Sequence, residues 1–142
     1  MKHLRVACAI IEKNGRLLVV QRSARMSRPL KWEFPGGKIE PGETPAECIR
    51  REIREELDLI VQPLAVWTGS PCRYHDTAIL LIPITCRIVG GRLKRREHEK
   101  TGWFAPNRLS ALDWAEADKP ILARYLSRRR SRARAIRKVA RA

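Results

Sequence analysis

The order of apolar and polar positions divides the start of the chain into two strands joined by a tight turn. Residues 4–11 are apolar and rich in β-branched side chains, and residues 16–20 resume the same character. Between them lies Asn14-Gly15, a dipeptide that favours the positive backbone angles of two-residue hairpin turns. The pattern therefore predicts a β-hairpin that opens the domain.

Further strand signals indicate that the hairpin belongs to a mixed sheet. A short run ends at Pro35-Gly36-Gly37, where the glycines permit backbone angles that other residues avoid, so a tight turn is expected. A later run ends at Gly90-Gly91, which marks another turn. The predicted strands are the apolar and β-branched runs at residues 32–34, 60–68, 77–89 and 102–104.

Residues 44–58 carry the clearest helix signal in the chain. Thr44 and Glu47 have the spacing of a capping box, and Pro45 occupies the first helical position. A helix is therefore predicted from Pro45 to about Asp58. Its buried stripe is expected at the positions that repeat with helical spacing, Ala46, Ile49, Ile53 and Leu57.

A second helix is predicted near the C-terminus. Residues 118–126 repeat apolar side chains with helical spacing, and the arginine-rich residues that follow continue the pattern weakly through Ile136 and Val139. With the strands, this predicts an α/β domain over residues 1–126 and a separate arginine-rich tail over residues 127–142. The inward-facing residues of this helix are predicted to be Ile121, Leu122, Tyr125 and Leu126.

The composition excludes several classes of protein. Apolar residues make up 44% of the chain, but no apolar run approaches the roughly 18 residues of a transmembrane helix. The N-terminal residues show no small-residue cleavage site of a signal peptide. The cysteines form no C-x-x-C pair and the three histidines show no metal-ligand spacing. Cys8, Cys48, Cys72 and Cys86 are therefore predicted to be reduced thiols. A cytoplasmic location of the protein is predicted as well.

The charge is strongly basic and unevenly distributed. The chain has 30 lysines and arginines against 15 acidic residues, a net charge of +15. Eight of the basic residues lie in residues 127–142, which contain no acid, so 22 basic against 15 acidic residues leave +7 in the remainder. This balance favours phosphates and nucleic acids as ligands. The tail has two interpretations, a nonspecific contact with nucleic acid or an anionic surface, and a solvated extension.

Three glutamates of the first predicted helix converge on one face. Glu52, Glu55 and Glu56 are spaced at i, i+3 and i+4, an arrangement that costs a helix a few tenths of a kcal/mol for each like-charged pair. A nearby positive charge would offset this repulsion, and either Arg51 and Arg54 or a metal ion would supply it. Hard oxygen ligands beside a glycine-rich turn suit Mg²⁺ shared with a phosphate substrate.

The residues around these glutamates resemble the Nudix box. Gly37 is followed after five residues by Glu43 and after seven more by residues 51–59, Arg-Glu-Ile-Arg-Glu-Glu-Leu-Asp-Leu. The one departure is Asp58, where the family usually has glycine. Aspartate tolerates a left-handed backbone better than most residues, so the turn is expected to survive.

The resemblance extends beyond the box and implies a fold. Residues 32–40 and 117–120 resemble the MutT-type branch and the related CTP pyrophosphohydrolases, so the similarity covers about residues 4–126. It implies a Nudix-type α/β/α sandwich with a mixed β-sheet. In that family the box forms a loop, a helix and a loop that hold a divalent metal ion against a diphosphate.

Carried over to this sequence, the resemblance also implies a set of site residues. Mg²⁺ is the expected cofactor, with Mn²⁺ as the alternative. Glu43 and Arg51 are expected to orient the helix carboxylates, and Glu52 or Glu97 to act as the base. The implied metal ligands are the carbonyl of Gly37 and the side chains of Glu52, Glu55, Glu56 and Glu97.

Five further residues are expected to contact the substrate. Arg22 and Lys38 are placed at the phosphates or the base, and Phe34 and Tyr74 are candidates for stacking on the base. In the MutT-type branch a side chain at the start of the last helix reads the base, and Asp118 has that position. An ionised aspartate only accepts hydrogen bonds, which suits cytosine N4 or the N7–H of 8-oxoguanine. The alternative is that it only caps the helix.

The implied activity is hydrolysis of nucleoside triphosphates to a monophosphate and pyrophosphate, with water attacking the β-phosphorus. The leading hypothesis is the removal of oxidised nucleotides such as 8-oxo-dGTP. Three alternatives stay open: a CTP or modified-dCTP pyrophosphohydrolase, an RNA 5′-end pyrophosphohydrolase that uses the basic tail, and a non-catalytic nucleotide-binding module. The intact glutamates of the box weaken the last of these.

Overall fold

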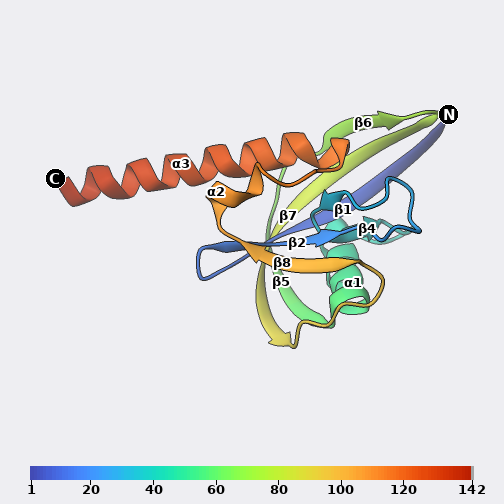
Figure 1. The fold of residues 1–142 in the computed structure, drawn as a ribbon, viewed down its shortest axis with the longest axis horizontal. Helices are drawn as coiled ribbons and strands as arrows, with labels where there is room; N and C mark the ends of the chain where they lie inside the picture. Colours follow the sequence, from blue (N-terminus) through green and yellow to red (C-terminus); the bar gives the residue numbers. More distant parts are fainter. Residues whose placement is uncertain (142) are drawn as a thin grey trace.

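The structure is a computed structural model that describes residues 1–141, in which an eight-stranded mixed sheet separates two helical layers (Figure 1). The predicted α/β/α sandwich is confirmed. The strands are β1 (Lys2–Lys13), β2 (Arg16–Gln21), β3 (Trp32–Glu33), β4 (Gly36–Lys38), β5 (Leu59–Val66), β6 (Ser70–Tyr74), β7 (Thr77–Gly91) and β8 (Lys100–Phe104). The helices are α1 (Pro45–Leu57), α2 (Pro106–Leu109), α3 (Lys119–Arg141) and the 3₁₀ turn η1 (Glu116–Asp118).

The central strand, β1, pairs with three neighbours. Over residues 2–11 it runs parallel to β7, over residues 6–8 it runs antiparallel to β4, and at Glu12 and Lys13 it pairs with β2. The strand order is β3-β2-β1-β7-β5, with β4 on β1, β6 on β7 and β8 on β2. Through this pairing β1 holds the short glycine strand β4 beside α1.

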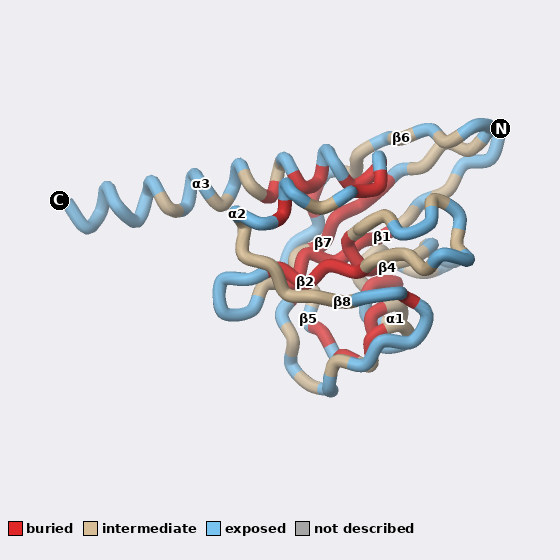
Figure 2. Tube along the Cα trace, viewed as in Figure 1, coloured by how far each residue is buried: buried red, intermediate tan, exposed pale blue. Residues whose placement is uncertain are grey.

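Alternation along the strands produces two hydrophobic cores, one on each face of the sheet. On β1, Ala9 and Ile11 face α1, whereas Cys8 and Ile10 face α3. Successive side chains of a strand point to opposite faces, so a nearly continuous apolar run is what a sheet covered on both sides requires. Figure 2 shows the buried segments of β1, β2 and β7 between the two helices. No disulfide links the four cysteines, which the structure describes as free.

The first helix begins and ends as its sequence predicts. The Thr44 side chain accepts a hydrogen bond from the Glu47 amide at 3.1 Å, and the Glu47 carboxylate accepts one from the Thr44 amide at 3.0 Å. At the other end Asp58 adopts the left-handed conformation with φ of 58°. The buried stripe contains Cys48 in place of the half-buried Ala46.

The two glycine pairs that were predicted as turns belong to strands instead. Gly36 and Gly37 pair with β1, and a Cβ on Gly36 would overlap the carbonyl oxygen of Ala7. Gly90 and Gly91 complete β7 opposite β5. Glycine occurs at such positions because neighbouring backbones approach too closely for a side chain.

Besides β4, the strand β6 was not predicted. β6 contains Pro71, and a proline argues against a strand in the middle of a sheet. Because β6 pairs only with β7, the missing N–H of the proline breaks no second ladder.

The C-terminal helix begins at Lys119, directly after η1, and runs through the arginine-rich residues to Arg141. Ile121, Leu122 and Tyr125 are buried as predicted. Beyond Arg132, which bonds Glu12 of β1, the helix extends away from the sheet (Figure 1), and Ile136 is 69% exposed. Among residues 1–141, no helix is long and apolar enough to cross a membrane.

Candidate active site

Arg51 is the centre of the charge network on α1. Its guanidinium donates two hydrogen bonds to Glu43, at 2.7 and 2.9 Å, and one to Oε1 of Glu52 at 2.8 Å. A weaker contact of 3.4 Å reaches Glu55, and the Lys38 carbonyl accepts another bond at 3.2 Å. The hydrogen bonds from Arg51 lower the pKa of Glu43 to about 2. The guanidinium therefore fixes the positions of the neighbouring carboxylates.

Glu52 lies directly against the backbone of Gly37. A Cβ built on this glycine would overlap the Glu52 carboxylate and lie only 2.6 Å from Oε2. The side chain of Glu52 is 15% exposed, so the carboxylate occupies the space that the missing side chain leaves. The sequence spacing thus places the Gly37 backbone and a helix carboxylate in contact.

Within the described chain, Glu56 is the glutamate of this face with a buried, unpartnered oxygen. Its Oε2 atom is buried and has no hydrogen-bond partner within the described residues 1–141. Burial raises the pKa of Glu56 to about 9, and the charge of Glu52 adds to the shift, followed by those of Glu33 and Glu97. At neutral pH this carboxyl holds a proton or requires a cation.

The remaining candidate ligands are more exposed. The Glu55 side chain is 61% exposed, and Glu97 lies exposed in the loop between β7 and β8. In the part of the chain that the structure describes, no three His, Cys, Asp or Glu side chains surround a common point at metal-binding distance. The guanidinium of Arg51 bridges Glu52 and Glu55 instead.

The donor set nevertheless suits a hard divalent cation. The unpartnered oxygen of Glu56, its raised pKa and the adjoining Glu52 carboxylate indicate a site where positive charge is missing. Carboxylate and carbonyl oxygens are the ligands that Mg²⁺ prefers. Glu52, Glu56 and the Gly37 carbonyl are therefore the residues that would hold such an ion.

Two residues of the site had no assigned role in the sequence. Glu33 on β3 forms an ion pair with Arg22 at 3.1 Å, and its charge acts on both Glu56 and Asp118. His98 is buried at 7% exposure, with Nε2 3.6 Å from Glu33. Arg22, which was placed at the substrate, is thus held by Glu33. A polar residue between two aromatics on a short strand is the signal that could have identified Glu33.

A cavity of 590 Å³ begins at the box and extends between β1, β4, β6 and η1. Its lining residues include Gly37, Lys38, Tyr74 and Asp118. The size suits a nucleotide, since ligand sites typically measure about 300–1,000 Å³. The structure therefore brings the Gly37 strand and the proposed base-reading residue to one cavity.

Asp118 is buried at 6% exposure, and its Oδ2 accepts a hydrogen bond from the Phe34 amide at 2.9 Å. The partner of this bond lies between β3 and β4, whereas a helix-capping side chain bonds an amide in the first turn of its own helix, here α3. Burial raises the pKa of Asp118 to about 8, and the charge of Glu33 acts in the same direction. The side chain is therefore mainly protonated at neutral pH, contrary to the ionised form assumed from the sequence.

Aromatic groups and an arginine complete the cavity wall. Phe34 is buried and its ring centroid lies 5.1 Å from that of Trp114. The Tyr74 hydroxyl accepts a hydrogen bond from the Ala117 amide at 2.8 Å. The Arg28 guanidinium lies 4.3 Å from the centre of the Tyr74 ring and lines the same cavity. Arg28 was not predicted as a site residue, because no local pattern in the sequence separates it from the other loop arginines.

Replacing Asp118 with Asn is expected to remove a pH dependence of stability. The folded pKa near 8 lies above the ordinary value of 3.8, so the folded state binds an extra proton between these values and stability falls as pH rises through that window. Asn keeps an oxygen for the Phe34 amide but does not titrate. The free energy of unfolding of Asp118→Asn, relative to the native chain, should rise by more than about 1 kcal/mol from pH 5 to pH 8.

Urea unfolding at several pH values measures this difference. Asp113→Asn is the matched control, because Asp113 is 72% exposed and pairs with Lys31 at the surface. Arg22 and Arg28 oppose the shift of Asp118, so they stay unchanged in both variants. Parallel stability curves for Asp118→Asn and the native chain would contradict the assignment of a protonated Asp118.

The fold and this site define a class of protein. A sheet between helices, a capped helix with clustered glutamates and an adjoining cavity of nucleotide size are the features of a hydrolase of the Nudix type. The family model of the NUDIX domain matches residues 1–125. The chain belongs to this family and is a Nudix hydrolase.

Individual relatives are similar over nearly the whole chain. The CTP pyrophosphohydrolase of Escherichia coli (strain K12) is 34% identical over 93% of this chain and 98% of its own length. The 8-oxo-dGTP diphosphatase of the same organism is 31% identical over 87% and 97%. The solution structure of the E. coli ORF135 protein has a TM-score of 0.82 at 32% identity, covering 93% of this chain and 94% of that one.

Proposed function

We propose that this Nudix hydrolase is a Mg²⁺-dependent pyrophosphohydrolase of nucleoside triphosphates that acts on oxidised nucleotides such as 8-oxo-dGTP. The observation that carries the proposal is the continuity of the cavity from Gly37, which contacts Glu52, to Asp118. A nucleotide in this cavity would have its phosphates beside the glutamates of α1 and its base beside Asp118. The two ends of the substrate thus meet groups of suitable chemistry.

The phosphate end offers groups for hydrolysis. A divalent ion would neutralise the phosphate oxygens and lower the pKa of the attacking water. Glu52, which bonds Arg51 and lies against the Gly37 backbone, would accept a proton from that water. Lys38 lines the cavity beside Gly37 and supplies positive charge to the phosphates. Glu97 is the second candidate for the base, and Mn²⁺ the second candidate for the metal.

The base end favours a nucleobase with a donor and an acceptor side by side. A protonated Asp118 donates one hydrogen bond and accepts others, unlike an ionised carboxylate. In 8-oxoguanine the O6 acceptor adjoins the N7–H donor, which matches this pair. Tyr74 and Phe34 provide the neighbouring apolar surface.

CTP or a modified dCTP is the second candidate substrate. Cytosine also has an acceptor, N3, beside a donor, N4–H, so a protonated Asp118 accommodates it as well. The similarity to a protein named CTP pyrophosphohydrolase, over 98% of that protein's length, favours this candidate.

Pyrophosphate release from a substrate panel tests the proposal. With Mg²⁺ present, 8-oxo-dGTP should be hydrolysed with a higher kcat/KM than dGTP, CTP, 5-hydroxy-dCTP or a 5′-triphosphorylated RNA. In ¹⁸O-labelled water the label should enter pyrophosphate, because attack at the β-phosphorus leaves the monophosphate unlabelled. Preference for the cytosine nucleotides would favour the second candidate substrate. Preference for the RNA, or label in the monophosphate, would contradict the proposed reaction.

A further inference from the structure

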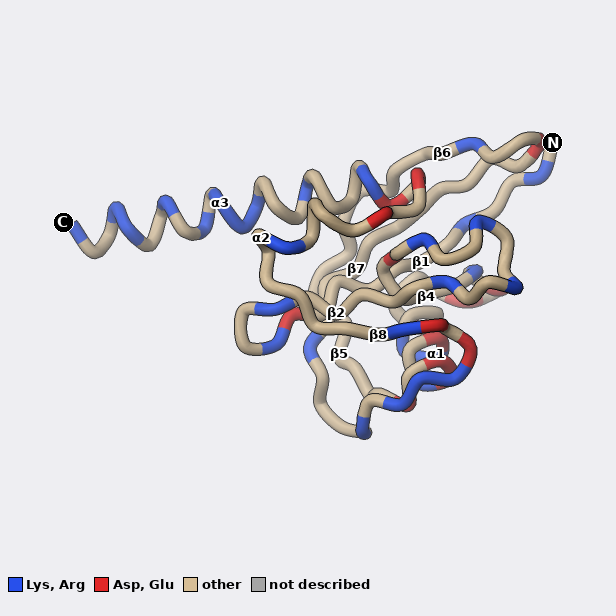
Figure 3. Tube along the Cα trace, in the orientation of Figure 1, with Lys and Arg blue, Asp and Glu red and all other residues tan. Residues whose placement is uncertain are grey.

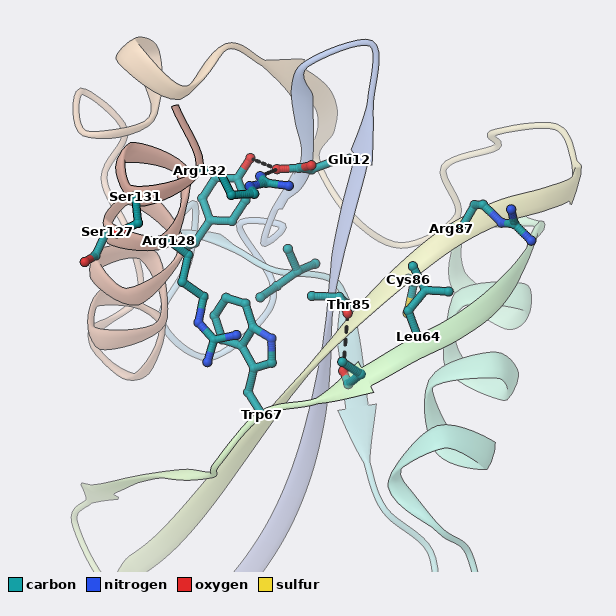
Figure 4. A pocket seen from close by; sticks show the side chains of 13 residues that line it. Glu12, Leu64, Trp67, Thr85, Cys86, Arg87, Ser127, Arg128, Ser131 and Arg132 are labelled. Carbon is teal, nitrogen blue, oxygen red and sulfur yellow. Dashed lines mark hydrogen bonds and ion pairs between the residues drawn. The ribbon is translucent and has the colours of Figure 1, made fainter. Parts of the chain in front are cut away.

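A second cavity, of 720 Å³, lies between α3 and the sheet and is separate from the cavity beside the box (Figure 4). Cys8 of β1 lines the first cavity, whereas Ile10 and Glu12 of the same strand line the second. Nothing in the hydrolysis of a nucleotide at the box uses this second cavity.

The wall of the second cavity contains an aromatic ring, Trp67, with an arginine, Arg128, stacked over it. The Arg128 guanidinium lies 3.9 Å from the centre of the Trp67 ring, and that of Arg124 lies 5.2 Å from it. Figure 4 shows Arg128 and Trp67 together at the cavity. Leu64 and Ala65 add apolar surface. A planar guanidinium over an aromatic ring is a surface on which nucleobases stack.

Glu12 fixes the arginine-rich part of α3 beside this cavity. One carboxylate oxygen accepts hydrogen bonds from the Tyr125 hydroxyl at 2.6 Å and from Arg132 at 3.0 Å, and it lies 3.4 Å from Arg129. These bonds join the end of β1 to two successive turns of the helix. The arginines that follow are therefore held in a set direction from the cavity, along the helix axis.

The exposed part of α3 carries positive charge only. The helix contains no acidic residue over its 23 residues, and Figure 3 shows its basic residues distributed along the whole length. Residues 128–141 would span about 20 Å at the rise of an α-helix, a length that matches several phosphates of an extended strand. The basic residues of this segment are Arg128, Arg129, Arg130, Arg132, Arg134, Arg137, Lys138 and Arg141.

We propose that this surface binds single-stranded nucleic acid, with one unstacked base in the second cavity on Arg128 and Trp67 and the following phosphates along α3. A basic track beside a stacking surface is the usual combination for binding single strands. A duplex would not suit the cavity, because its bases are already stacked. An anionic membrane suits the helix less well, because Ile136 and Val139 are its only exposed large apolar residues among those described.

Fluorescence anisotropy with a labelled short oligouridylate tests the proposal on the full chain. The logarithm of the association constant should fall with the logarithm of salt concentration with a slope of about −3 to −4, as expected for about four to six phosphate contacts to a single strand. A duplex of the same length and vesicles rich in phosphatidylserine are the competing ligands. Equal affinity for the duplex, or binding to the vesicles without binding to the RNA, would overturn the proposal.

Variants at Arg128 separate stacking from charge. Arg128→Ala should weaken RNA binding by about 5- to 100-fold, and Arg128→Lys should weaken it as well, because lysine keeps the charge but not the planar group. Arg92→Ala, which removes an exposed arginine just after β7, is the matched control and should change affinity by no more than about 2-fold. Wild-type affinity in Arg128→Lys would refute the stacking site. Hydrolysis of nucleotides should stay unchanged in all three variants, so failure here and failure of the proposed substrate are distinguishable.

Discussion

Glu52→Gln is expected to lower kcat by about 10²- to 10⁴-fold, the range usually contributed by a positioned general base. Glu52 is the box carboxylate that touches both the Gly37 backbone and the Arg51 guanidinium, and it lies next to the partly buried Glu56. The substitution preserves shape but removes the charge that accepts a proton and attracts a cation. Steady-state pyrophosphate release with Mg²⁺ measures the loss.

Glu47→Gln provides the control on the same helix. It removes one carboxylate charge from α1, yet glutamine still completes a capping box with Thr44. The thermal midpoints of both variants should stay close to that of the native chain, and Glu47→Gln should keep near-native activity. Comparable activity in Glu52→Gln and Glu47→Gln would show that another carboxylate, such as Glu97, accepts the proton.

Gly37→Ala is expected to lower kcat/KM by about 10²-fold with little loss of stability. The new methyl group would occupy the space of the Glu52 carboxylate, and a flexible side chain, unlike backbone, can rotate to another conformation. A displacement of about 1 Å at a reacting group is enough for a loss of this size. The expected defect is therefore in the geometry of the site, and the fold should survive.

Gly36→Ala is the matched comparison one residue earlier. There the methyl group would overlap the Ala7 carbonyl oxygen and lie 2.8 Å from the Cys8 Cα, both of which are backbone atoms. Backbone cannot move aside without breaking the pairing of β4 with β1, so a destabilisation of at least about 3 kcal/mol is expected. Urea unfolding and kinetics on both variants provide the test. Equal stability of the two variants would contradict this difference.

The sequence predicts those parts of the fold that depend on neighbouring residues. The capping box of Thr44 and Glu47 and the left-handed turn at Asp58 involve partners within four residues of each other. The α3 core residues Ile121 and Tyr125 follow from helical spacing alone. Local signals of this kind do not require knowledge of the sheet.

Features that depend on distant parts of the chain were not predictable in the same way. A Pro-Gly-Gly segment favours a turn locally, and only the closeness of β1 shows that Gly36 lies in a strand. The raised pKa of Asp118 follows from its burial in the folded chain, and the Phe34 amide that binds its carboxyl lies 84 residues away. The contact of His98 with Glu33 likewise joins a loop to a separate strand.

The candidate site also contains both contacts between neighbouring elements and contacts between distant parts of the chain. The closeness of Gly37 to Glu52, and of Glu52 to Glu56, involves β4 and α1, which are neighbours in the sequence. Their roles as metal ligands stay a prediction. Arg28 and Glu33 acquire their positions only when the loop after β2 folds over the cavity.

The parallel pairing of β1 with β7 constrains the order in which the chain folds. Each residue of β1 between Lys2 and Ile11 pairs with one 75 positions later, so the centre of the sheet cannot form until β7 has left the ribosome. Long-range parallel pairing is slow compared with helix formation. During synthesis α1 would therefore exist before the sheet that covers its apolar face, and Ile49 and Ile53 would remain open to chaperones until β7 arrives.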